Sequence, residues 1–156
     1  MKKAIFLIVM SMALVACGSN TSNKSKIKKS LPILTTITGE HIDFNHLKRK
    51  WVLINYWANW CEPCKKEIPE LNSFAKNHKN VYMVGVNYDG VDNHHLIELI
   101  AKNEIHYFNS LTDPVQSLGL GDIPGLPVTF VFNQKGKLRK TLFGPQTDKS
   151  LEKALS

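Results

Sequence analysis

The fold of this chain is decided by residues 51–71, which read WVLINYWANWCEPCKKEIPEL. The first eight of these, Trp51–Ala58, are almost continuously apolar, which is typical of a strand buried on both faces of a sheet. After Cys61, apolar residues at positions 68, 71, 74 and 75 recur at helical spacing and predict a helix that runs to about His78. Cys61 and Cys64 therefore lie where a strand ends and a helix begins.

Strands and helices alternate through the rest of the folded part. The predicted elements are a β-hairpin within Leu31–Phe44, strands at Val81–Tyr88, Val128–Phe132 and Leu138–Phe143, a helix marked by Leu96, Ile97, Ile100 and Ala101, and a last helix capped by Thr147 or Asp148 with Leu151, Ala154 and Leu155 inward. This order predicts a small α/β sandwich. The sequence contains no internal repeat and no second domain.

Length, composition and charge exclude several classes of protein. The 156 residues suit one domain, and 43% hydrophobic residues argue against a disordered chain. Three cysteines are too few for a disulfide-dense scaffold. The net charge is +7, but Lys2, Lys3 and four lysines between residues 17 and 30 supply most of it. The remaining residues are close to neutral, so we expect no nucleic-acid partner.

The N-terminus has the pattern of an export signal. Lys2 and Lys3 precede an apolar run, Ala4–Val15, that is shorter than the roughly 20 residues of a membrane-spanning helix. It ends in Leu-Val-Ala before Cys17, which resembles a bacterial lipoprotein processing site. We therefore predict a signal peptide over residues 1–16 and a lipid on Cys17. An ordinary secretory signal that ends in a chance cysteine is the alternative, and both place the protein outside the cytoplasm.

Residues 17–30 are polar and rich in lysine, which predicts a flexible tether between the lipid and the domain. The lysines of this tether either add a weak attraction to anionic lipid headgroups or belong to a merely soluble spacer. The folded domain is then expected to span residues 31–156.

The motif Trp60-Cys61-Glu62-Pro63-Cys64 carries the chemistry. Residues three apart at the start of a helix share one face, so the two sulfurs can meet. Unpaired N–H groups and the positive end of the helix dipole favour a thiolate on Cys61. We expect Cys61 to be exposed and to attack, and Cys64, one turn further and more buried, to resolve the mixed disulfide. Pro63 suits a first helical turn, because it lacks an N–H.

Three other readings of the cysteine pair compete with redox activity. A structural zinc site normally has four ligands, and no second cysteine pair exists in the sequence. Covalent haem attachment needs a histidine after the second cysteine, where this chain has Lys65. A structural disulfide between Cys61 and Cys64 closes so short a loop that it stabilises by well under the roughly 3 kcal/mol of a 15-residue loop. We expect neither a metal nor another cofactor beyond the redox-active disulfide.

Two segments give the chain a family resemblance. Residues 55–71, NYWANWCEPCKKEIPEL, and residues 125–132, GLPVTFVF, are similar to the corresponding segments of TlpA/ResA-like extracytoplasmic thiol–disulfide oxidoreductases, which have a thioredoxin-like fold. The resemblance covers about Leu31 to Ser156. It implies a single α/β domain with a central mixed sheet flanked by helices, an N-terminal β-hairpin, and a strand–helix insert around Val91–Phe108.

The resemblance also implies roles for individual residues. Pro127 matches the cis-proline that faces the cysteine pair in this family, and the backbone of Leu126 would pair with a client segment there. Trp60 and Pro63 are expected to border the same client site. Glu67 matches an acidic residue near the family's active site. We expect it to accept the proton of Cys64, because Asn55, an amide, cannot; the alternative is a solvated helix charge.

The leading hypothesis is a membrane-tethered protein-disulfide reductase. The resemblance suggests that a membrane thiol-redox partner supplies its electrons and that its clients are proteins with cysteines or disulfides, among them the apocytochromes c of cytochrome c maturation. The expected location is extracytoplasmic, on a bacterial membrane and facing the periplasm in a Gram-negative cell. A disulfide-introducing oxidase and a non-catalytic, copper-binding lipoprotein are the alternatives.

Overall fold

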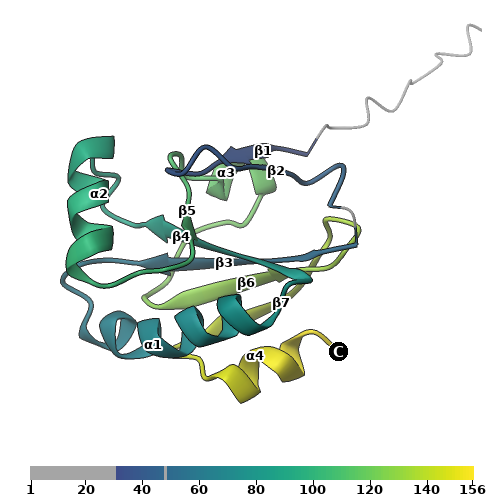
Figure 1. The fold of residues 1–156 in the computed structure, drawn as a ribbon. Coiled ribbons are helices and arrows are strands. Elements are labelled where there is room, and N and C mark those ends of the chain that lie inside the picture. Colours follow the sequence, from purple (N-terminus) through teal and green to yellow (C-terminus); the bar gives the residue numbers. More distant parts are fainter. Residues whose placement is uncertain (1–30, 48) are drawn as a thin grey trace, which may run out of the picture.

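A five-stranded sheet forms the centre of the molecule, with strands in the order β5-β4-β3-β6-β7 (Figure 1). The computed structural model describes residues 31–47 and 49–156. The predicted signal peptide, the lipidated Cys17 and the tether over residues 17–30 lie outside the described residues. A smaller sheet of two strands, β1 and β2, is the predicted N-terminal hairpin.

The strands and helices follow one another in an order that matches most of the predicted pattern. They are β1 Ile33–Thr35, β2 His41–Asp43, β3 Trp51–Trp57, α1 Glu62–Asn77, β4 Val81–Asn87, α2 Asn93–Lys102, β5 Phe108–Asn109, α3 Val115–Leu118, β6 Val128–Phe132, β7 Leu138–Phe143 and α4 Asp148–Ala154.

The sheet is mixed, as the resemblance implied. β3 pairs in parallel with β4, and β4 pairs in parallel with β5. β6 pairs antiparallel with β3, and β7 pairs antiparallel with β6. A parallel pair needs a crossover connection, and α1 supplies it between β3 and β4. One end of the sheet therefore gathers the end of β3, the start of α1, the start of β6 and the end of β7.

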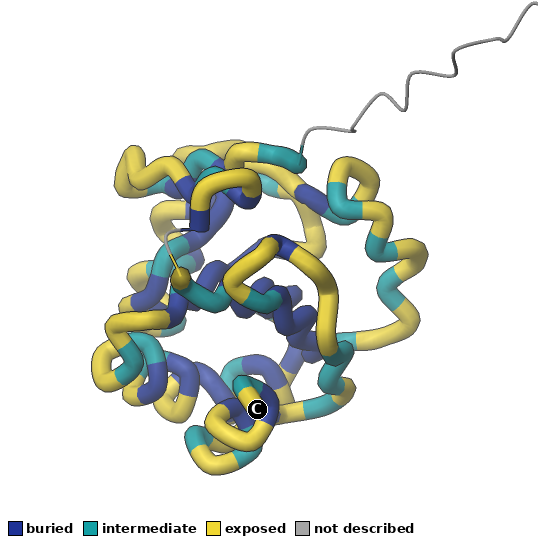
Figure 2. Tube along the Cα trace, turned by 90° about the vertical axis from the view of Figure 1, so that its right-hand side faces the viewer, coloured by how far each residue is buried: buried dark blue, intermediate teal, exposed yellow. Residues whose placement is uncertain are grey.

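The two faces of β3 belong to two different hydrophobic clusters. Leu53 and Trp57 pack with residues of α1 and α4, on one side of the sheet. Val52, Ile54 and Tyr56 pack with the β1–β2 hairpin and with residues around α3, on the other side. Figures 1 and 2 show the resulting layers, with buried chain along the central strands and exposed chain on the outer loops. The prediction of a strand buried on both faces is confirmed.

Helix α1 begins where the sequence predicts a helix start. Cys61 is its N-cap, and Pro63 lies in its first turn, where a missing N–H costs no intrahelical bond. The residues of its buried face are Cys64, Glu67, Ile68, Leu71 and Phe74. This spacing of three and four places them in one stripe against the sheet, and it includes one acidic side chain.

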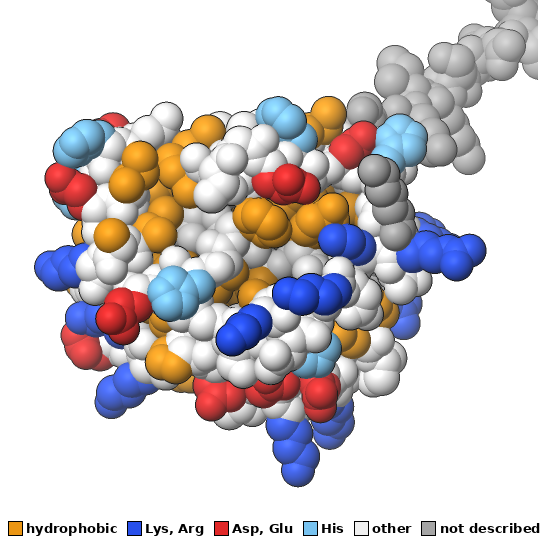
Figure 3. All heavy atoms as spheres, in the orientation of Figure 1, with side chains coloured by type: hydrophobic (Ala, Val, Ile, Leu, Met, Phe, Trp, Pro, Cys, Tyr) orange, Lys and Arg blue, Asp and Glu red, His pale blue; other side chains and the backbone are white. Residues whose placement is uncertain are grey.

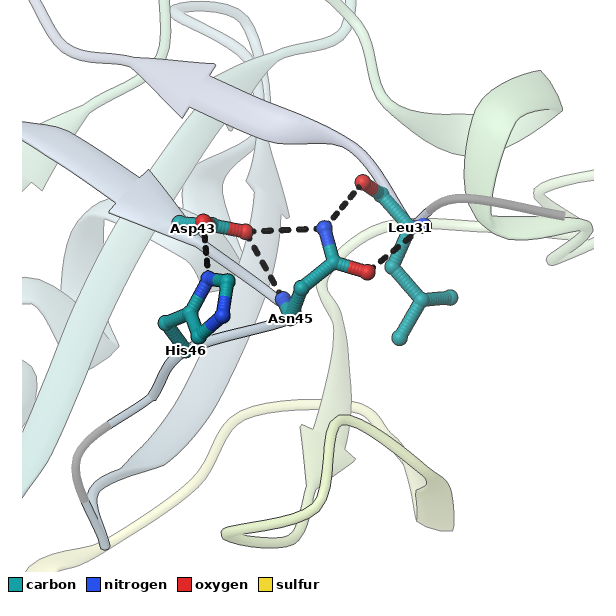
Figure 4. Close-up of polar contacts among 4 residues, drawn as sticks. All are labelled: Leu31, Asp43, Asn45 and His46. Carbon is teal, nitrogen blue, oxygen red and sulfur yellow. Dashed lines mark hydrogen bonds and ion pairs between the residues drawn. The ribbon is translucent and has the colours of Figure 1, made fainter. Parts of the chain in front are cut away.

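A network of polar contacts holds the start of the described chain against the hairpin (Figure 4). The backbone N–H of Leu31 donates to Asn45 Oδ1 at 3.1 Å, and Asn45 Nδ2 donates to the Leu31 carbonyl at 2.8 Å. Asp43 in turn accepts from the Asn45 backbone at 2.8 Å and contacts His46 Nδ1 at 2.8 Å. Hydrogen bonds from His46 and then from Asn45 hold the pKa of Asp43 down at about 2.

Four details differ from the sequence prediction. The buried face of α2 carries Leu96 and Leu99, whereas Ile97 and Ala101, which marked this helix in the sequence, are exposed. The insert is a helix followed by a two-residue strand, α2 and then β5, and β5 extends the sheet beside β4. The four-residue helix α3 was not predicted, because one turn is too short to show a periodicity. Leu155 lies just after the end of α4 and is only half-buried, although it was expected to point inward. Of the two predicted cap residues, Thr147 is the one that caps α4.

No helix among residues 31–47 and 49–156 has the length and apolar character needed to cross a membrane.

Gly85 provides a test of the packing around the sheet. A Cβ at this position would overlap Asn109 Oδ1 and come within 3.0 Å of Trp57 Nε1, and these two atoms share a hydrogen bond of 3.1 Å. We expect Gly85→Ala to lower the free energy of unfolding by about 1–3 kcal/mol in urea denaturation, since an overpacked core strains its neighbours. Gly125→Ala is the matched control, because nothing lies within 4 Å of its added Cβ. Equal losses in both variants would contradict this account.

Candidate active site

The two cysteines form a disulfide at the start of α1. Their Cα atoms lie 5.3 Å apart, and the S–S distance is 2.06 Å. Cys61 Sγ accepts the backbone N–H of Cys64 at 3.2 Å, so this sulfur occupies the position of a helix N-cap acceptor. In the reduced protein the same N–H and the helix dipole would favour a thiolate on Cys61 over one on Cys64.

Cys61 is more buried than the sequence suggested, whereas Cys64 is buried as expected. The exposed fraction is 4% for Cys61 and 1% for Cys64. Both belong to the hydrophobic cluster between the sheet and α1, together with Trp57, Ala58 and Ile68. The expectation of an exposed Cys61 is therefore wrong for the disulfide form, because the helix start tucks this sulfur into the cluster. The expected ranking, with Cys64 the more buried, is confirmed.

Glu67 is a buried carboxylate one turn beyond Cys64. Only 2% of its surface is exposed, which overturns the alternative of a solvated helix charge. Glu67 Oε1 accepts from Asn55 Nδ2 at 2.7 Å, and Oε2 accepts from the Gln146 backbone N–H at 2.8 Å. Asn55 Nδ2 also lies 3.1 Å from Thr129 Oγ1. The carboxylate thus joins α1 to β3 and to the segment between β7 and α4.

The surroundings of Glu67 change its acidity. Burial raises its pKa from 4.5 to about 7, against the opposing effect of the Gln146 and Asn55 hydrogen bonds. The Tyr107 hydroxyl is buried and has no hydrogen-bond partner among residues 31–47 and 49–156. Burial, and after it the charge of Glu67, raises the pKa of Tyr107. Glu67 can therefore gain or lose a proton near neutral pH while it stays inside the fold.

The loop before β6 faces the same end of the sheet. The Leu126–Pro127 peptide bond is cis, as the resemblance implied. The Gly144 N–H donates to the Pro127 carbonyl at 2.9 Å, which joins this loop to the end of β7. A small cavity of about 260 Å³ lies here, lined by residues 124–127 with Phe143 and Gly144. Pro127 is buried, Leu126 is half-buried, and 64% of Phe143 is exposed.

Trp60 stands on the surface beside the disulfide. Its side chain is 63% exposed, and its indole N–H donates to Asp89 Oδ1 at 2.9 Å. Asp89 follows the end of β4, so this contact connects the loop before α1 to the neighbouring strand. Trp57 is a core residue, as predicted, and its indole donates to Asn109 Oδ1. Pro63 is exposed in the first turn of α1.

The histidines lie outside the Trp60–Cys64 motif, on several other elements. His94 and His95 are exposed on α2, and His94 Nδ1 lies 3.5 Å from Glu98 Oε1. Among the described residues, one group has three ligand atoms within 4.8 Å of one another: His78, Asp148 and Glu152. It lies where the C-terminal end of α1 meets α4. The sequence spacing did not reveal it, because His78 is about 70 residues from Asp148 and Glu152. His78 Nε2 already contacts Glu152 Oε1 at 3.4 Å.

Gln146 is the site residue that sequence reasoning missed. Its backbone N–H donates to Glu67, which is 79 residues earlier in the chain. Because the contact uses the backbone, the identity of the side chain could not indicate it in the sequence. Its own side chain is buried and bonds to Gly144 and Ser150, which fixes the segment that meets the carboxylate. Only the fold brings this segment to α1.

Comparison with known proteins gives consistent results. A model of the AhpC/TSA family matches residues 27–141. Sporulation thiol-disulfide oxidoreductase A of Bacillus subtilis (strain 168) is 29% identical, over 97% of this chain and 95% of the relative. Thiol-disulfide oxidoreductase ResA of Bacillus thuringiensis (strain Al Hakam) is 30% identical, over 83% of this chain and 76% of the relative.

Solved structures agree with these relatives. The crystal structure of StoA from Bacillus subtilis superposes with a TM-score of 0.66 at 30% identity, covering 81% of this chain and 96% of that protein. This match confirms the predicted thioredoxin-like fold, with a mixed sheet between helices.

The raised pKa of Glu67 predicts how stability depends on pH. The pKa of Glu67 is about 7 in the folded protein and 4.5 as the ordinary value. Between these values the unfolded chain releases the proton while the folded protein keeps it, so the disulfide form should lose stability as pH rises from 4.5 to 7 and change little above 7. The loss should be on the order of 3 kcal/mol. Glu67→Gln mimics the neutral acid, so we expect it to flatten this slope in urea denaturation from pH 4.5 to 8.5.

Glu98→Gln is the matched control, since Glu98 is exposed on α2. This variant should keep the slope of the wild type. If Glu67→Gln kept it too, the titration of a different group would be responsible.

Proposed function

Because the chain belongs to the AhpC/TSA family and is a thiol–disulfide oxidoreductase, we propose that it reduces disulfides of client proteins outside the cytoplasm. The observation that supports this best is the Cys61–Cys64 disulfide at the start of α1, one helical turn from a buried carboxylate. In this proposal Cys61 attacks, Cys64 resolves, and Glu67 handles the proton of Cys64.

The exchange moves two electrons and two protons. The Cys61 thiolate attacks one sulfur of a client disulfide, and the other client sulfur leaves as a thiolate that takes up a proton. Cys64 then loses its proton and attacks Cys61 Sγ, which breaks the mixed disulfide and releases the second client thiolate. The protein ends with the Cys61–Cys64 disulfide, and a membrane thiol donor returns it to the dithiol by the same exchange in reverse.

The position of Glu67 supports its role as proton acceptor. It lies three residues beyond Cys64 on the buried face of α1, so both side chains project to the same side of the helix. A pKa of about 7 lets the carboxylate accept a proton near neutral pH. When ionised, it also raises the pKa of a nearby thiol, which favours a reductant over an oxidant whose cysteine has a very low pKa.

The surroundings of the disulfide suggest how a client is held. The backbone of Leu126, before the cis-proline Pro127, would pair with an extended client segment beside the sulfurs. The small cavity at this loop has room for one client side chain. Trp60 and Pro63, both exposed at the start of α1, would cover the opposite side of the segment. Only 4% of the Cys61 surface is exposed. A client disulfide can therefore reach this sulfur only by direct contact with the surface above it or after the first turn of α1 moves.

Location and partners complete the proposal. The leader and Cys17 support anchoring by lipid on the outer side of a bacterial membrane, where the chain would meet a membrane thiol-redox partner. Apocytochrome c cysteines are among the clients that the family resemblance suggests, alongside other wrongly oxidised thiols.

Cysteine variants test the exchange. In the presence of a thiol donor, reduction of the disulfides of insulin is measured by the precipitation of the separated insulin chains. We expect Cys61→Ser to abolish this reduction. Cys64→Ser should instead accumulate a client on Cys61, visible as a band that a reductant releases, since the resolving thiol is gone. Unchanged turnover in Cys61→Ser would contradict the proposal, and so would tight copper retention by cysteines that do not exchange.

The reduction potential of the wild-type protein tests the direction of electron transfer. A reduction potential near −270 mV, measured by equilibration with glutathione, would support a reductant, and a value near −120 mV an oxidase.

A labelling experiment tests the anchor. Cells that express the wild type should incorporate radiolabelled fatty acid into the protein, and cells that express Cys17→Ser should not, because the thioether sulfur is lost. Cys61→Ser serves as the control for general loss of a thiol and should label as the wild type does. Label in both cysteine variants would refute lipidation at Cys17.

A further inference from the structure

One buried hydroxyl has no part in the exchange chemistry above. Tyr107 precedes β5, is 7% exposed and belongs to the same hydrophobic cluster as Cys61 and Cys64. Its hydroxyl oxygen is buried without a hydrogen-bond partner in the part of the chain that the structure describes. A buried hydroxyl that bonds to nothing destabilises a fold, so this one calls for a partner.

A second buried polar atom, on Asn55, is also unpaired. Asn55 Nδ2 donates to Glu67 Oε1 at 2.7 Å and lies 3.1 Å from Thr129 Oγ1. Asn55 Oδ1, the other end of the same amide, has no hydrogen-bond partner among the described residues, and the side chain is fully buried. The protein therefore buries an unpaired donor on Tyr107 and an unpaired acceptor on Asn55.

The sheet brings these two side chains to the same face. Side chains alternate along a strand, and Leu53 and Trp57, two residues before and after Asn55, both pack toward α1. Asn55 therefore projects to the α1 side. Tyr107 packs in that same cluster, and Asn109, two residues after it, accepts the Trp57 indole N–H at 3.1 Å. The Tyr107 hydroxyl and Asn55 Oδ1 thus both lie between the sheet and α1.

Glu67 is the third polar group in this place. It lies on the buried face of α1, and each of its oxygens accepts one N–H, from Asn55 or from Gln146. A carboxylate oxygen has two lone pairs, so each can accept one more hydrogen bond. Burial, and after it the charge of Glu67, raises the pKa of Tyr107, which agrees with a short distance between the two groups. A donor, an acceptor and a carboxylate therefore meet beneath one helix.

We propose that one water molecule binds between Tyr107, Asn55 and Glu67. Through this water, Tyr107 acts as a positioning residue for the proton transfer from Cys64 to Glu67. The water accepts a hydrogen bond from the Tyr107 hydroxyl and donates to Asn55 Oδ1 and to a Glu67 oxygen. Both unpaired atoms then have a partner, and the water makes about three hydrogen bonds, as is usual for buried water in proteins.

This inference rests on the proposed exchange and explains how Glu67 takes part in it. A third hydrogen bond favours the ionised carboxylate, which is the form that accepts a proton. In the resolving step the S–H bond of Cys64 breaks, an O–H bond forms on Glu67, and Tyr107 keeps its own proton. Of the other groups that face Glu67, the Asn55 amide and the Gln146 backbone do not titrate, and β4 and α4 contribute apolar side chains to the cluster.

Tyr107 also separates this site from solvent. It lines a surface groove of about 670 Å³ between α1, the β4–β5 edge and the β1–β2 hairpin. Figure 3 shows this face, where hydrophobic side chains lie in a hollow. The ring of Tyr107 therefore stands between the groove and its own buried hydroxyl, and a movement of this one side chain would let the bound water exchange.

The variant Tyr107→Phe tests the proposal, because it removes the hydroxyl and keeps the ring. The full chain, purified in detergent as the disulfide, is titrated while NMR follows the labelled carboxyl carbon of Glu67, with Glu67→Gln to assign the signal. We expect Tyr107→Phe to hold the Glu67 proton about tenfold more tightly than the wild type, because the ionised carboxylate loses a hydrogen bond. An unchanged titration would overturn the role of Tyr107.

Tyr56→Phe is the matched control. Tyr56 is fully buried on the other face of β3, and its hydroxyl donates to Asp113 Oδ1. This variant also loses a buried hydroxyl, but it should leave the titration of Glu67 as it is in the wild type. An equal change in both variants would show a general effect of a lost hydroxyl and would contradict the proposal.

The resolving step provides a second readout. The dithiol protein reacts with dithiobis(nitrobenzoate), which releases a coloured thiolate when Cys61 attacks and again when Cys64 resolves. We expect Tyr107→Phe to slow the second release several-fold at neutral pH, to leave the first unchanged, and to match the wild type at high pH, where Glu67 is ionised in both. A wild type without the second release would refute the proposed exchange, and the titration of Glu67 would still decide the water site.

A crystal structure of the wild type tests the water directly. The water should lie about 2.5–3.0 Å from Tyr107 Oη, Asn55 Oδ1 and one Glu67 oxygen. A direct hydrogen bond from Tyr107 to Glu67 or to Asn55, with no water between them, would overturn the water site.

Discussion

The buried carboxylate of Glu67 is the constraint on which the arrangement of this site depends. A charge that leaves water destabilises the fold unless hydrogen bonds replace its hydration. Here two N–H groups replace that hydration only in part, one from Asn55 on β3 and one from the Gln146 backbone after β7. Three parts of the chain must therefore meet at the same point. Cys64 lies one turn away on the same buried face of α1, so the acid that joins these three parts is on the same side of the helix as the resolving cysteine.

The topology explains why the rest of the chemistry gathers beside this carboxylate. The crossover from β3 to β4 starts α1 at the end of β3, which puts the disulfide at that end of the sheet. β6 runs antiparallel to β3, so its first residues, after the cis peptide at Pro127, come to the same end. The Gly144–Pro127 and Gln146–Glu67 hydrogen bonds then connect both features through one short segment. A shift in this segment would therefore change both hydrogen bonds, the one to the Glu67 carboxylate and the one to the Pro127 loop.

Local patterns in the sequence were sufficient for the strands other than β5, for the main helices and for the cysteine pair. The apolar run before Cys61 and the helical spacing after it specify β3 and α1, because burial on two faces and on one stripe leaves distinct periodicities. The burial of Glu67 was not predictable from spacing, since its partner Gln146 is 79 residues away and contributes only a backbone group. The low exposure of Cys61 was missed for a similar reason: a helix cap position indicates reactivity but not how tightly neighbouring residues pack over the sulfur.

The same limit applies to charge. The net charge of the sequence resides mainly in its first 30 residues, and the near-neutral remainder gave no reason to expect a basic surface. Yet Lys50 precedes β3, Lys76 lies in the last turn of α1 and Lys79 precedes β4, and the crossover brings these positions to one edge of the sheet. Helix α1 thus has a redox pair at its first turn and two of these lysines at or just beyond its last. The 16 residues of α1 keep these two ends of the helix apart, so the basic positions lie away from the redox pair.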